Sequence, residues 1–435
     1  MDSGLVKIYS TEDLPRLNYI AGIVFGDILG LQWELTTDKR RFGKHPVINY
    51  SDEKLNGSFK ISPSGILSEK GIRAREITVG EWKSLPIFFY CQPDCDIPFD
   101  IFAASFYLIS RYEEYLDNKP DDHNRYKASS SLAFKNSFLG KPVVDLWARE
   151  LSKLLIRKFP TLTFRRNEFK SLVTIDVDQP FAYKGKGFMR SIGGLIRDLG
   201  RNGGEAGERF KTISKGDSDP YDVFAYISEK IEENRTDSRF FFPVGNHSKY
   251  DVNPSWKNSE YRHLIEDMAG KYSTGLHPSY YAANDIALLS EEAKRLGAIL
   301  RKEIKAGRFH YIRLLLPASY RNMSASGIAE DYSMGYPEEP GFRAGIARPF
   351  YFYDLDSERQ TDLKVFPFQV MDATLMQYKR LGPEQAGEVI DGLLAETRKA
   401  GGLFLSIWHN TTLLDDNEGR EWRKIFEKLL QNQRQ

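Results

Sequence analysis

The sequence predicts an α/β protein of two units, a smaller α/β domain at residues 1–160 and a larger domain at residues 165–435. A chain of 435 residues is too long for one hydrophobic core, because domains usually hold roughly 100–200 residues. A polar stretch around residues 160–168 separates two parts of different character. Beyond it, short apolar runs alternate with amphipathic segments, which is typical of a parallel sheet with helices packed against it.

The first unit combines short strands with two amphipathic helices. Apolar residues recur at helical spacing over residues 102–115 and again over residues 143–157. The run SLPIFFY at residues 84–90 has the composition of a strand and is bounded by turn-forming residues. Residues 1–160 are therefore expected to form a compact α/β unit.

The second unit repeats the strand and helix signals several times. Its expected strands are residues 172–176, 240–245, a short run ending at His277, and residues 309–316, 365–370 and 403–408. Its expected helices are residues 222–234, 259–270, 286–306, 374–381 and 384–400. The sheet could be open or closed into a barrel, and in a barrel the functional residues gather at the carboxyl ends of the strands. The glycine-rich stretch at residues 193–207 follows no strand directly, so we expect a mobile loop rather than a phosphate cradle.

Composition and charge exclude several classes of protein. Apolar residues make up 41% of the chain, so we expect it to be globular throughout. Lys and Arg total 61 against 60 for Asp and Glu, so no long-range field favours nucleic acid or an anionic membrane. The first twenty residues are interrupted by acidic side chains, unlike a signal peptide, and no apolar run approaches a membrane span. These observations predict a cytoplasmic protein, with Cys91 and Cys95 as ordinary thiols.

The strongest candidate for chemistry is the pair Asp176 and Asp178 at the end of the expected strand LVTID. Strand alternation directs both carboxylates to the same side, where one could bind a metal and the other act as a general base. Carboxylates also cap turns or stay solvated after strands, and the pair alone does not decide between these interpretations.

Four further polar residues follow later strands. His277 could bind a divalent metal, and His409 could act as a general acid at the end of the last strand. Arg343 could hold a carboxylate, and Asp372 could orient His409 through a hydrogen bond. Each residue by itself is more often structural, but their order along one α/β unit favours a site.

That order, TIDVD, HPS, FRAG, MDAT and IWHN, resembles the motif layout of NodB-type polysaccharide deacetylases, the carbohydrate esterases of family four. The resemblance covers roughly residues 165–430. The runs EDYSMGYPEEPGFRAG and R-x-H-x-x-R, together with ISPSGILSEKGI and FYLISRYEEYL nearer the N-terminus, resemble a bacterial subgroup with an additional N-terminal domain of unknown role. The resemblance implies a distorted (β/α) barrel that removes acetyl groups from sugars by metal-assisted attack of water.

The resemblance also implies roles for individual residues. Asp176 corresponds to the general base and Arg343 to the arginine that fixes it, while Asp372 tunes the general acid His409. Asp178 and His277 correspond to metal ligands for zinc, with cobalt or nickel as alternatives. The candidate substrate contacts are Ser279, Tyr281, Arg313 and Trp408.

Tyr281 departs from the family pattern, because the family has a second histidine ligand at this position. Two protein ligands hold a metal weakly, since catalytic zinc sites normally use three. His310, within R-x-H-x-x-R, or His247 could supply the third ligand, and we favour His310.

Three hypotheses for function follow. The first is a metal-dependent hydrolase that removes an acetyl or similar group from a sugar, glycan or cell-envelope precursor. The second is an impaired deacetylase-like barrel that binds a glycan, motivated by Tyr281. The third is an assembly role for residues 1–160. Neither the identity of the sugar nor the oligomeric state follows from the sequence.

Overall fold

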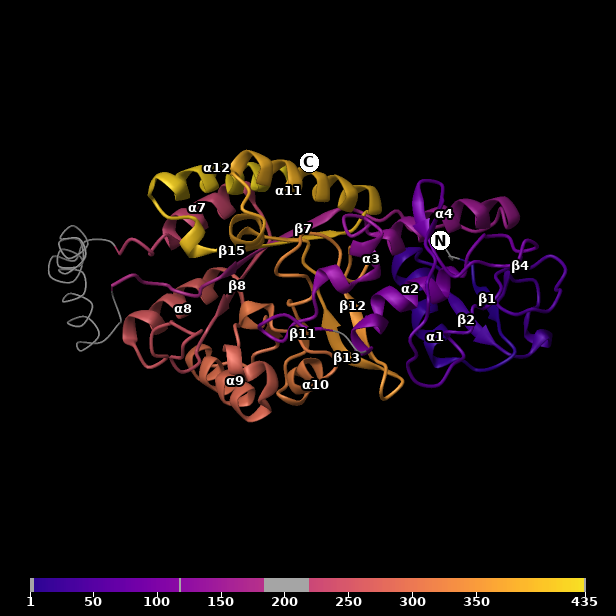
Figure 1. The fold of residues 1–435 in the computed structure, drawn as a ribbon, viewed down its shortest axis with the longest axis horizontal. Coiled ribbons are helices and arrows are strands. Elements are labelled where there is room, and N and C mark those ends of the chain that lie inside the picture. Colours follow the sequence, from indigo (N-terminus) through magenta and orange to yellow (C-terminus); the bar gives the residue numbers. More distant parts are fainter. Residues whose placement is uncertain (1–3, 117–118, 184–218, 434–435) are drawn as a thin grey trace.

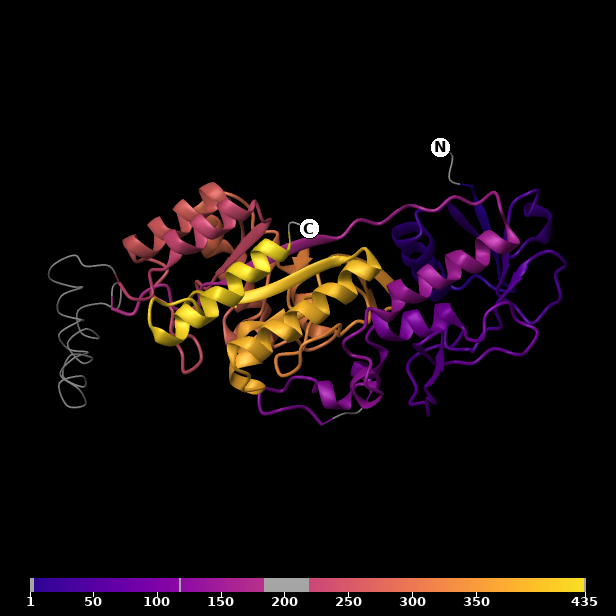
Figure 2. The ribbon, with the colours of Figure 1, turned by 90° about the horizontal axis from the view of Figure 1, so that it is seen from above.

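The structure, a computed structural model, describes residues 4–116, 119–183 and 219–433. The molecule is elongated: β1, β2, α1, α2 and α4 lie at one end, and the elements from β7 onward form the other (Figure 1). Figure 2 shows the segment between α4 and β7 running along the molecule to connect the two parts. The predicted division at residues 160–165 remains a prediction, and the glycine-rich residues 193–207 lie outside the described part. Within the described residues, no helix has the length and apolar character needed to cross a membrane.

The N-terminal part is built on a four-stranded parallel sheet in the order β2-β1-β3-β4. Its strands are β1 (Val6–Tyr9), β2 (Trp33–Thr36), β3 (Val47–Asn49) and β4 (Phe59–Lys60). A separate hairpin pairs β5 (Gly80–Trp82) with β6 (Leu85–Ile87). The helices are α1 (Pro15–Ala21), which continues as the π-helix η1 (Gly22–Ile28), α2 (Ile101–Ile109), the short α3 (Leu132–Lys135) and α4 (Val143–Lys158).

The helix predicted over residues 102–115 is broken near its end. Helix α2 ends at Ile109, and a 3₁₀ helix, η3 (Tyr112–Tyr115), follows it. Arg111 between them adopts a left-handed conformation with φ of 55° and donates a hydrogen bond to the carbonyl of Arg343. A tertiary contact therefore interrupts a pattern that is locally helical.

The C-terminal part contains a nine-stranded mixed sheet in the order β12-β13-β11-β10-β9-β8-β7-β15-β14. All neighbours are parallel except the antiparallel pair β12 and β13. Its strands are β7 (Lys170–Asp176), β8 (Ser238–Phe242), β9 (Ser273–Leu276), β10 (Ala306–Gly307), β11 (Glu330–Asp331), β12 (Phe350–Asp354), β13 (Arg359–Val365), β14 (Val370–Met371) and β15 (Leu403–His409). Among the described residues β12 and β14 do not pair with each other, so a closed barrel is not seen.

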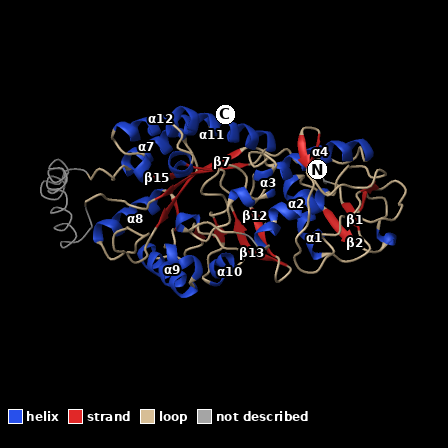
Figure 3. Ribbon diagram, viewed as in Figure 1, coloured by secondary structure: helices blue, strands red, loops and turns tan. Residues whose placement is uncertain are grey.

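Helices cover this sheet in two groups (Figures 1 and 3). Helix α12 (Asn417–Asn432) packs on α11 (Pro383–Ala400) and α7 (Phe224–Asn234). Helix α9 (Ile286–Leu300) packs between α8 (Ser259–Lys271) and α10 (Ala318–Ala325). The predicted helix over residues 286–306 ends early, because Arg301 turns into the left-handed conformation and the chain then enters β10.

Strand alternation divides the interior into two apolar cores. In β8, Phe240 and Phe242 join the large core, whereas Phe241 joins a small second core. In β15, Leu405 and Ile407 likewise belong to the second core. Successive side chains of a strand point to opposite faces, so residues of the same parity as Ile407, including His409, share its face of the sheet.

Two predicted strands are wrong. Residues 365–370 are not one strand, because β13 ends at Val365, residues 366–369 form a loop, and β14 begins at Val370. Residues 309–316 were expected to be extended, but β10 ends at Gly307 and a 3₁₀ turn, η6 (His310–Ile312), follows. Tyr311 and Ile312 both have positive φ values, 60° and 51°, which no strand allows. The apolar character of this segment comes from burial of a turn, which periodicity does not distinguish from a buried strand.

Candidate metal centre

The carboxyl ends of three strands that are close in the sheet meet at one cavity. His409 ends β15 and pairs in register with Asp176 at the end of β7. His277 directly follows β9, one strand beyond β8. Together with Asp178 and His310, these residues line a cavity of about 350 Å³. Parallel pairing therefore gathers side chains that are more than 200 residues apart in the sequence.

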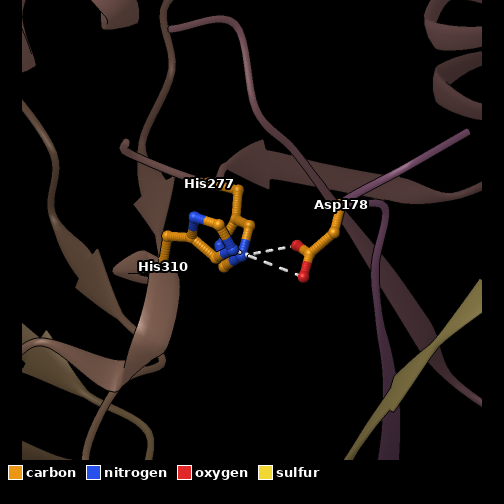
Figure 4. Close-up of side chains that lie close together, drawn as sticks. All are labelled: Asp178, His277 and His310. Carbon is orange, nitrogen blue, oxygen red and sulfur yellow. Dashed lines mark ion pairs between the residues drawn. The ribbon is translucent and has the colours of Figure 1, made fainter. Parts of the chain in front are cut away.

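Asp178, His277 and His310 converge on a single point (Figure 4). One ligand atom from each lies within 4.8 Å of the others. Nε2 of His277 is 3.1 Å from Oδ1 of Asp178, and Nε2 of His310 is 3.4 Å from Oδ2 of the same carboxylate. The site thus brings together two imidazoles and a carboxylate, a donor set that suits a catalytic zinc ion with an open coordination position.

Hydrogen bonds from neighbouring groups orient both imidazoles. Nδ1 of His277 lies 2.6 Å from the carbonyl oxygen of Arg308, and a carbonyl can only accept, so Nδ1 carries the proton. Nδ1 of His310 lies 2.9 Å from Oδ1 of Asp251. In both residues the lone pair of Nε2 is thereby left for the point near Asp178.

Two atoms at this point are buried without a hydrogen-bond partner: Oδ1 of Asp178 and Nε2 of His277. Their 3.1 Å separation does not have hydrogen-bond geometry. Buried polar atoms are nearly always satisfied, so two unsatisfied atoms that can only accept hydrogen bonds and that face one another need an explanation. A cation between them would satisfy both, and we conclude that these residues fit a divalent metal.

The electrostatics of the site also favour a cation. Burial alone raises the pKa of the Asp178 carboxyl, but the charge of His310 and the other imidazoles close to the carboxylate hold it well below its ordinary value. Burial lowers the pKa of His310, and the carboxylates of Asp178 and Asp251 more than offset this, raising it to about 9. The same field that favours a proton on His310 favours a metal ion at this point.

Asp176 is held by a buried arginine. Its side chain is only 2% exposed, and its Oδ1 accepts a 2.7 Å hydrogen bond from Nη1 of Arg308. Its other oxygen, Oδ2, lies 4.0 Å from Nε2 of His277. The carboxylate therefore has one oxygen fixed by Arg308 and a second directed toward the metal-ligand cluster.

His409 forms a dyad with Asp372 on the other side of the cavity. Nδ1 of His409 lies 2.6 Å from Oδ1 of Asp372, and the backbone N–H of His409 donates to Oδ2 of the same carboxylate. Nε2 of His409 is 3.7 Å from Oδ2 of Asp178. Burial lowers the pKa of His409, but the Asp372 carboxylate outweighs it and raises the pKa to about 10.

Comparisons with known proteins give two findings. Residues 6–160 match a family of unknown function, DUF7033. No curated protein matches the chain. We refer to residues 6–160 below as the DUF7033 segment.

Several solved structures similar to the chain are named as polysaccharide deacetylases, all at low identity. One from Mycobacterium smegmatis has a TM-score of 0.39 and 11% identity, covering 61% of this chain and 84% of its own. The polysaccharide deacetylase from Bacillus cereus has a TM-score of 0.31 and 11% identity, covering 61% and 88%. A pseudoenzyme of carbohydrate esterase family 4 from Bacillus anthracis has a TM-score of 0.31 and 10% identity, covering 61% and 63%. Because these scores are low, the functional argument rests on the site itself.

The structure corrects the expected partner of Asp176. Arg343 donates to both oxygens of Glu114, in the DUF7033 segment, and to the carbonyl of Gly335, so it is committed away from the cavity. Arg308 makes the expected contact instead. Both are buried arginines, and only the fold decides which one faces the carboxylate at the end of β7.

Two expected substrate contacts are structural residues. Trp408 is 1% exposed and packs on Phe426 of α12, because its place in β15 alternates with that of His409 and turns it to the helix face. Ser279 is buried, and its backbone N–H and hydroxyl both donate to the carboxylate of Glu292. Neither side chain lines the cavity.

The other two expected contacts lie near the cavity but outside its lining. Tyr281 is 52% exposed and contacts the rings of Tyr250 and Tyr280. Arg313 donates to the carbonyls of His123 and Tyr280. His247, the alternative third ligand, is exposed and does not belong to the group formed by Asp178, His277 and His310.

Sequence reasoning missed three residues of the site: Arg308, Asp251 and Arg125. Arg308 belongs to the R-x-H-x-x-R run, whose first arginine could have been considered as a partner for Asp176. Asp251 orients His310, but it lies in a loop with no pattern that distinguishes it. Arg125 lines the cavity although it belongs to the DUF7033 segment. Only tertiary contacts identify the last two.

Proposed function

We propose that the protein is a metal-dependent hydrolase that removes an acetyl or similar acyl group from a sugar-containing substrate. The observation that carries this proposal is the convergence of Asp178, His277 and His310 on one point of the cavity, with Asp176 and His409 beside it. A divalent cation, zinc by the chemistry of the donor set, supplies Lewis acidity that polarises a carbonyl and acidifies water.

The protein's own residues supply the proton transfers. Asp176 accepts the proton of the attacking water at Oδ2, while Arg308 holds Oδ1 and fixes the orientation of the carboxylate. His409 donates a proton from Nε2 to the leaving nitrogen or oxygen, and Asp372 keeps the proton on Nδ1. The base and the acid thus approach the scissile bond from different strands, β7 and β15.

The cavity wall supports a carbohydrate as the substrate. Tyr250, Tyr311 and Tyr378 line the cavity, and tyrosines offer flat apolar faces with a polar end. The same three side chains support a second candidate function, glycan binding without turnover. In this proposal His310 supplies the third metal ligand in place of the family histidine that Tyr281 replaces. A cytoplasmic location, which would favour a soluble precursor as the substrate, is part of this proposal.

The proposal is tested by loading the full chain in turn with zinc, cobalt and nickel. Release of acetate is then measured from N-acetylated and O-acetylated oligosaccharides and from acetylated sugar nucleotides. We expect release by the wild type and a kcat/KM that is about 10²–10⁴-fold lower for Asp176→Asn, the range typical of a lost general base. Asp354→Asn is the matched control, since Asp354 ends β12 and pairs with Arg321 outside the cavity.

Two results would count against hydrolysis. Stoichiometric zinc with no acetate released from any substrate would leave glycan binding, which calorimetry with the same oligosaccharides measures. Absence of bound metal after incubation with excess zinc would remove the proposed mechanism altogether.

A further inference from the structure

A short segment of the DUF7033 region reaches the metal centre. Asp121 and Arg125 close a tight loop: the backbone N–H groups of His123 and Arg125 donate to Oδ1 of Asp121, and Nε of Arg125 donates to Oδ2 at 2.7 Å. The loop therefore holds its own arginine in one orientation. The Arg125 residue is 3% exposed and lines the same cavity as the candidate metal ligands.

The two terminal nitrogens of Arg125 donate hydrogen bonds to two residues that line the cavity. Nη1 donates a 2.6 Å hydrogen bond to the carbonyl oxygen of Tyr311, and Nη2 donates to the hydroxyl of Tyr378 at 3.2 Å. The carboxylate of Asp121 balances its charge. A guanidinium that is paired with a carboxylate and bonded through all three nitrogens is poorly suited to capture an anionic substrate.

The carbonyl that Arg125 holds belongs to Tyr311, the residue directly after the candidate ligand His310. Tyr311 and Ile312 adopt left-handed conformations in succession, with φ values of 60° and 51°. This conformation is unfavourable in free energy for residues other than glycine, which keep it only where surrounding contacts impose it. The backbone N–H of His310 donates to the carbonyl of Pro278, just after His277.

A second set of contacts also joins the loop at residues 121–125 to the turn at residues 310–313, this time with the donor in the turn. Nε of Arg313 donates to the carbonyl oxygen of His123, and the ring of His123 lies 5.1 Å from that of Tyr311. Arg125 donates to the Tyr311 carbonyl and Arg313 to the His123 carbonyl, so each arginine bonds a backbone carbonyl of the other's loop. This reciprocal pairing joins the DUF7033 segment to the turn at residues 310–313.

We propose that the DUF7033 segment completes the metal centre, and that Arg125 is a positioning residue that holds the strained turn presenting His310. The inference rests on the proposed function, since it concerns the third ligand of the proposed metal site. It assigns a role to the DUF7033 segment: a part of the proposed active site supplied from outside the nine-stranded part of the chain.

The test measures zinc affinity of the full chain by competition with a chromogenic chelator. We expect Arg125→Ala to weaken zinc binding by about 10–100-fold, the loss usual for residues that orient a metal ligand. Arg125→Lys should recover part of the affinity, because an ammonium can still donate to the Tyr311 carbonyl. Arg321→Ala is the matched control: it also removes a paired arginine, bonded to Asp354, but leaves affinity unchanged.

The possible outcomes distinguish a failure of this inference from a failure of the proposed function. Wild-type protein that binds no zinc would overturn both. Wild-type binding that weakens in His310→Ala but not in Arg125→Ala would overturn this inference alone. If Arg125→Ala does not fold, Asp121→Asn takes its place, because it releases Arg125 while keeping its side chain; unchanged zinc affinity in a folded Asp121→Asn protein would also overturn the inference.

Discussion

Two clusters of buried charge in this molecule differ in how completely they are satisfied. The cavity cluster consists of Asp176, Asp178, His277, His310 and His409. The Arg343 cluster, between the DUF7033 segment and the nine-stranded part, consists of Arg111, Glu113, Glu114, Tyr336 and Arg343. In the Arg343 cluster no buried side-chain nitrogen or oxygen lacks a hydrogen-bond partner, whereas the cavity cluster leaves Oδ1 of Asp178 and Nε2 of His277 without one.

The two clusters also differ in charge: the Arg343 cluster is neutral and the cavity cluster is negative. Two arginines face two glutamates in the Arg343 cluster, so its formal charge is zero. The cavity cluster and its supports contain four carboxylates, from Asp176, Asp178, Asp251 and Asp372. The guanidinium of Arg308 and the protonated forms of His310 and His409, whose pKa values are raised, offset only three of these charges. A neutral cluster whose polar atoms are all hydrogen-bonded joins parts of a protein, whereas a negative cluster with unsatisfied lone pairs offers a site to a cation.

The comparison is tested most strongly by Arg343→Met. It leaves Glu114 buried beside Arg111 alone, so we expect the free energy of unfolding to fall by about 3–5 kcal/mol. Zinc affinity of the folded protein should not change. Chemical denaturation and chelator competition measure the two quantities. Arg321→Met, which breaks a more exposed ion pair, should cost no more than about 1 kcal/mol. Weakened zinc binding in Arg343→Met would place Arg343 in the site after all.

A paired substitution sharpens the distinction between the clusters. Asp178→Asn should weaken zinc binding by about 100-fold or more, because the amide loses the negative charge that the metal pairs with. Glu113→Gln should leave zinc affinity unchanged and lower the free energy of unfolding by about 1–3 kcal/mol, since Glu113 accepts from Arg111 and from the backbone N–H of Leu132. Reversed results would mean that unsatisfied donor atoms do not identify the metal site.

Glu292 gives the smallest expected effect and lies beneath the loop that follows His277. Burial raises the pKa of this carboxyl to about 7, although hydrogen bonds from Ser279 oppose the shift. Its ordinary pKa is about 4.5, so the folded state binds the proton more tightly. Its contribution to stability is therefore complete below about pH 4.5 and is lost as the pH rises through about 7.

We expect the free energy of unfolding of the wild type to fall by about 1–2 kcal/mol between pH 5 and pH 7.5 from this group. Glu292→Gln should flatten that part of the profile, because the amide does not titrate. Denaturation midpoints across this pH range are the measurement, with Glu291→Gln as the exposed neighbouring control. An unchanged slope in Glu292→Gln would show that the carboxyl is ionised throughout.

Much of the site could be predicted from local sequence, because a polar residue directly after an apolar strand lies at the carboxyl edge of a parallel sheet. Asp176, His277 and His409 all lie at the expected ends of β7, β9 and β15 and line the cavity. Arg343 and Arg308 could not be distinguished in this way. Each lies in an irregular segment, and its partner comes from a residue more than 100 positions away.

By itself, the sequence determined the parallel α/β character of the C-terminal part and the strand-end positions of the carboxylates and histidines, since strand and helix periods and turn residues are local properties. Tertiary structure alone decided that residues 310–312 form a turn rather than a strand, that Arg308 faces Asp176, and that Arg125 reaches the cavity. Those outcomes depend on contacts between distant segments. Such contacts offset the free-energy cost of strained conformations and select one partner among several buried charges.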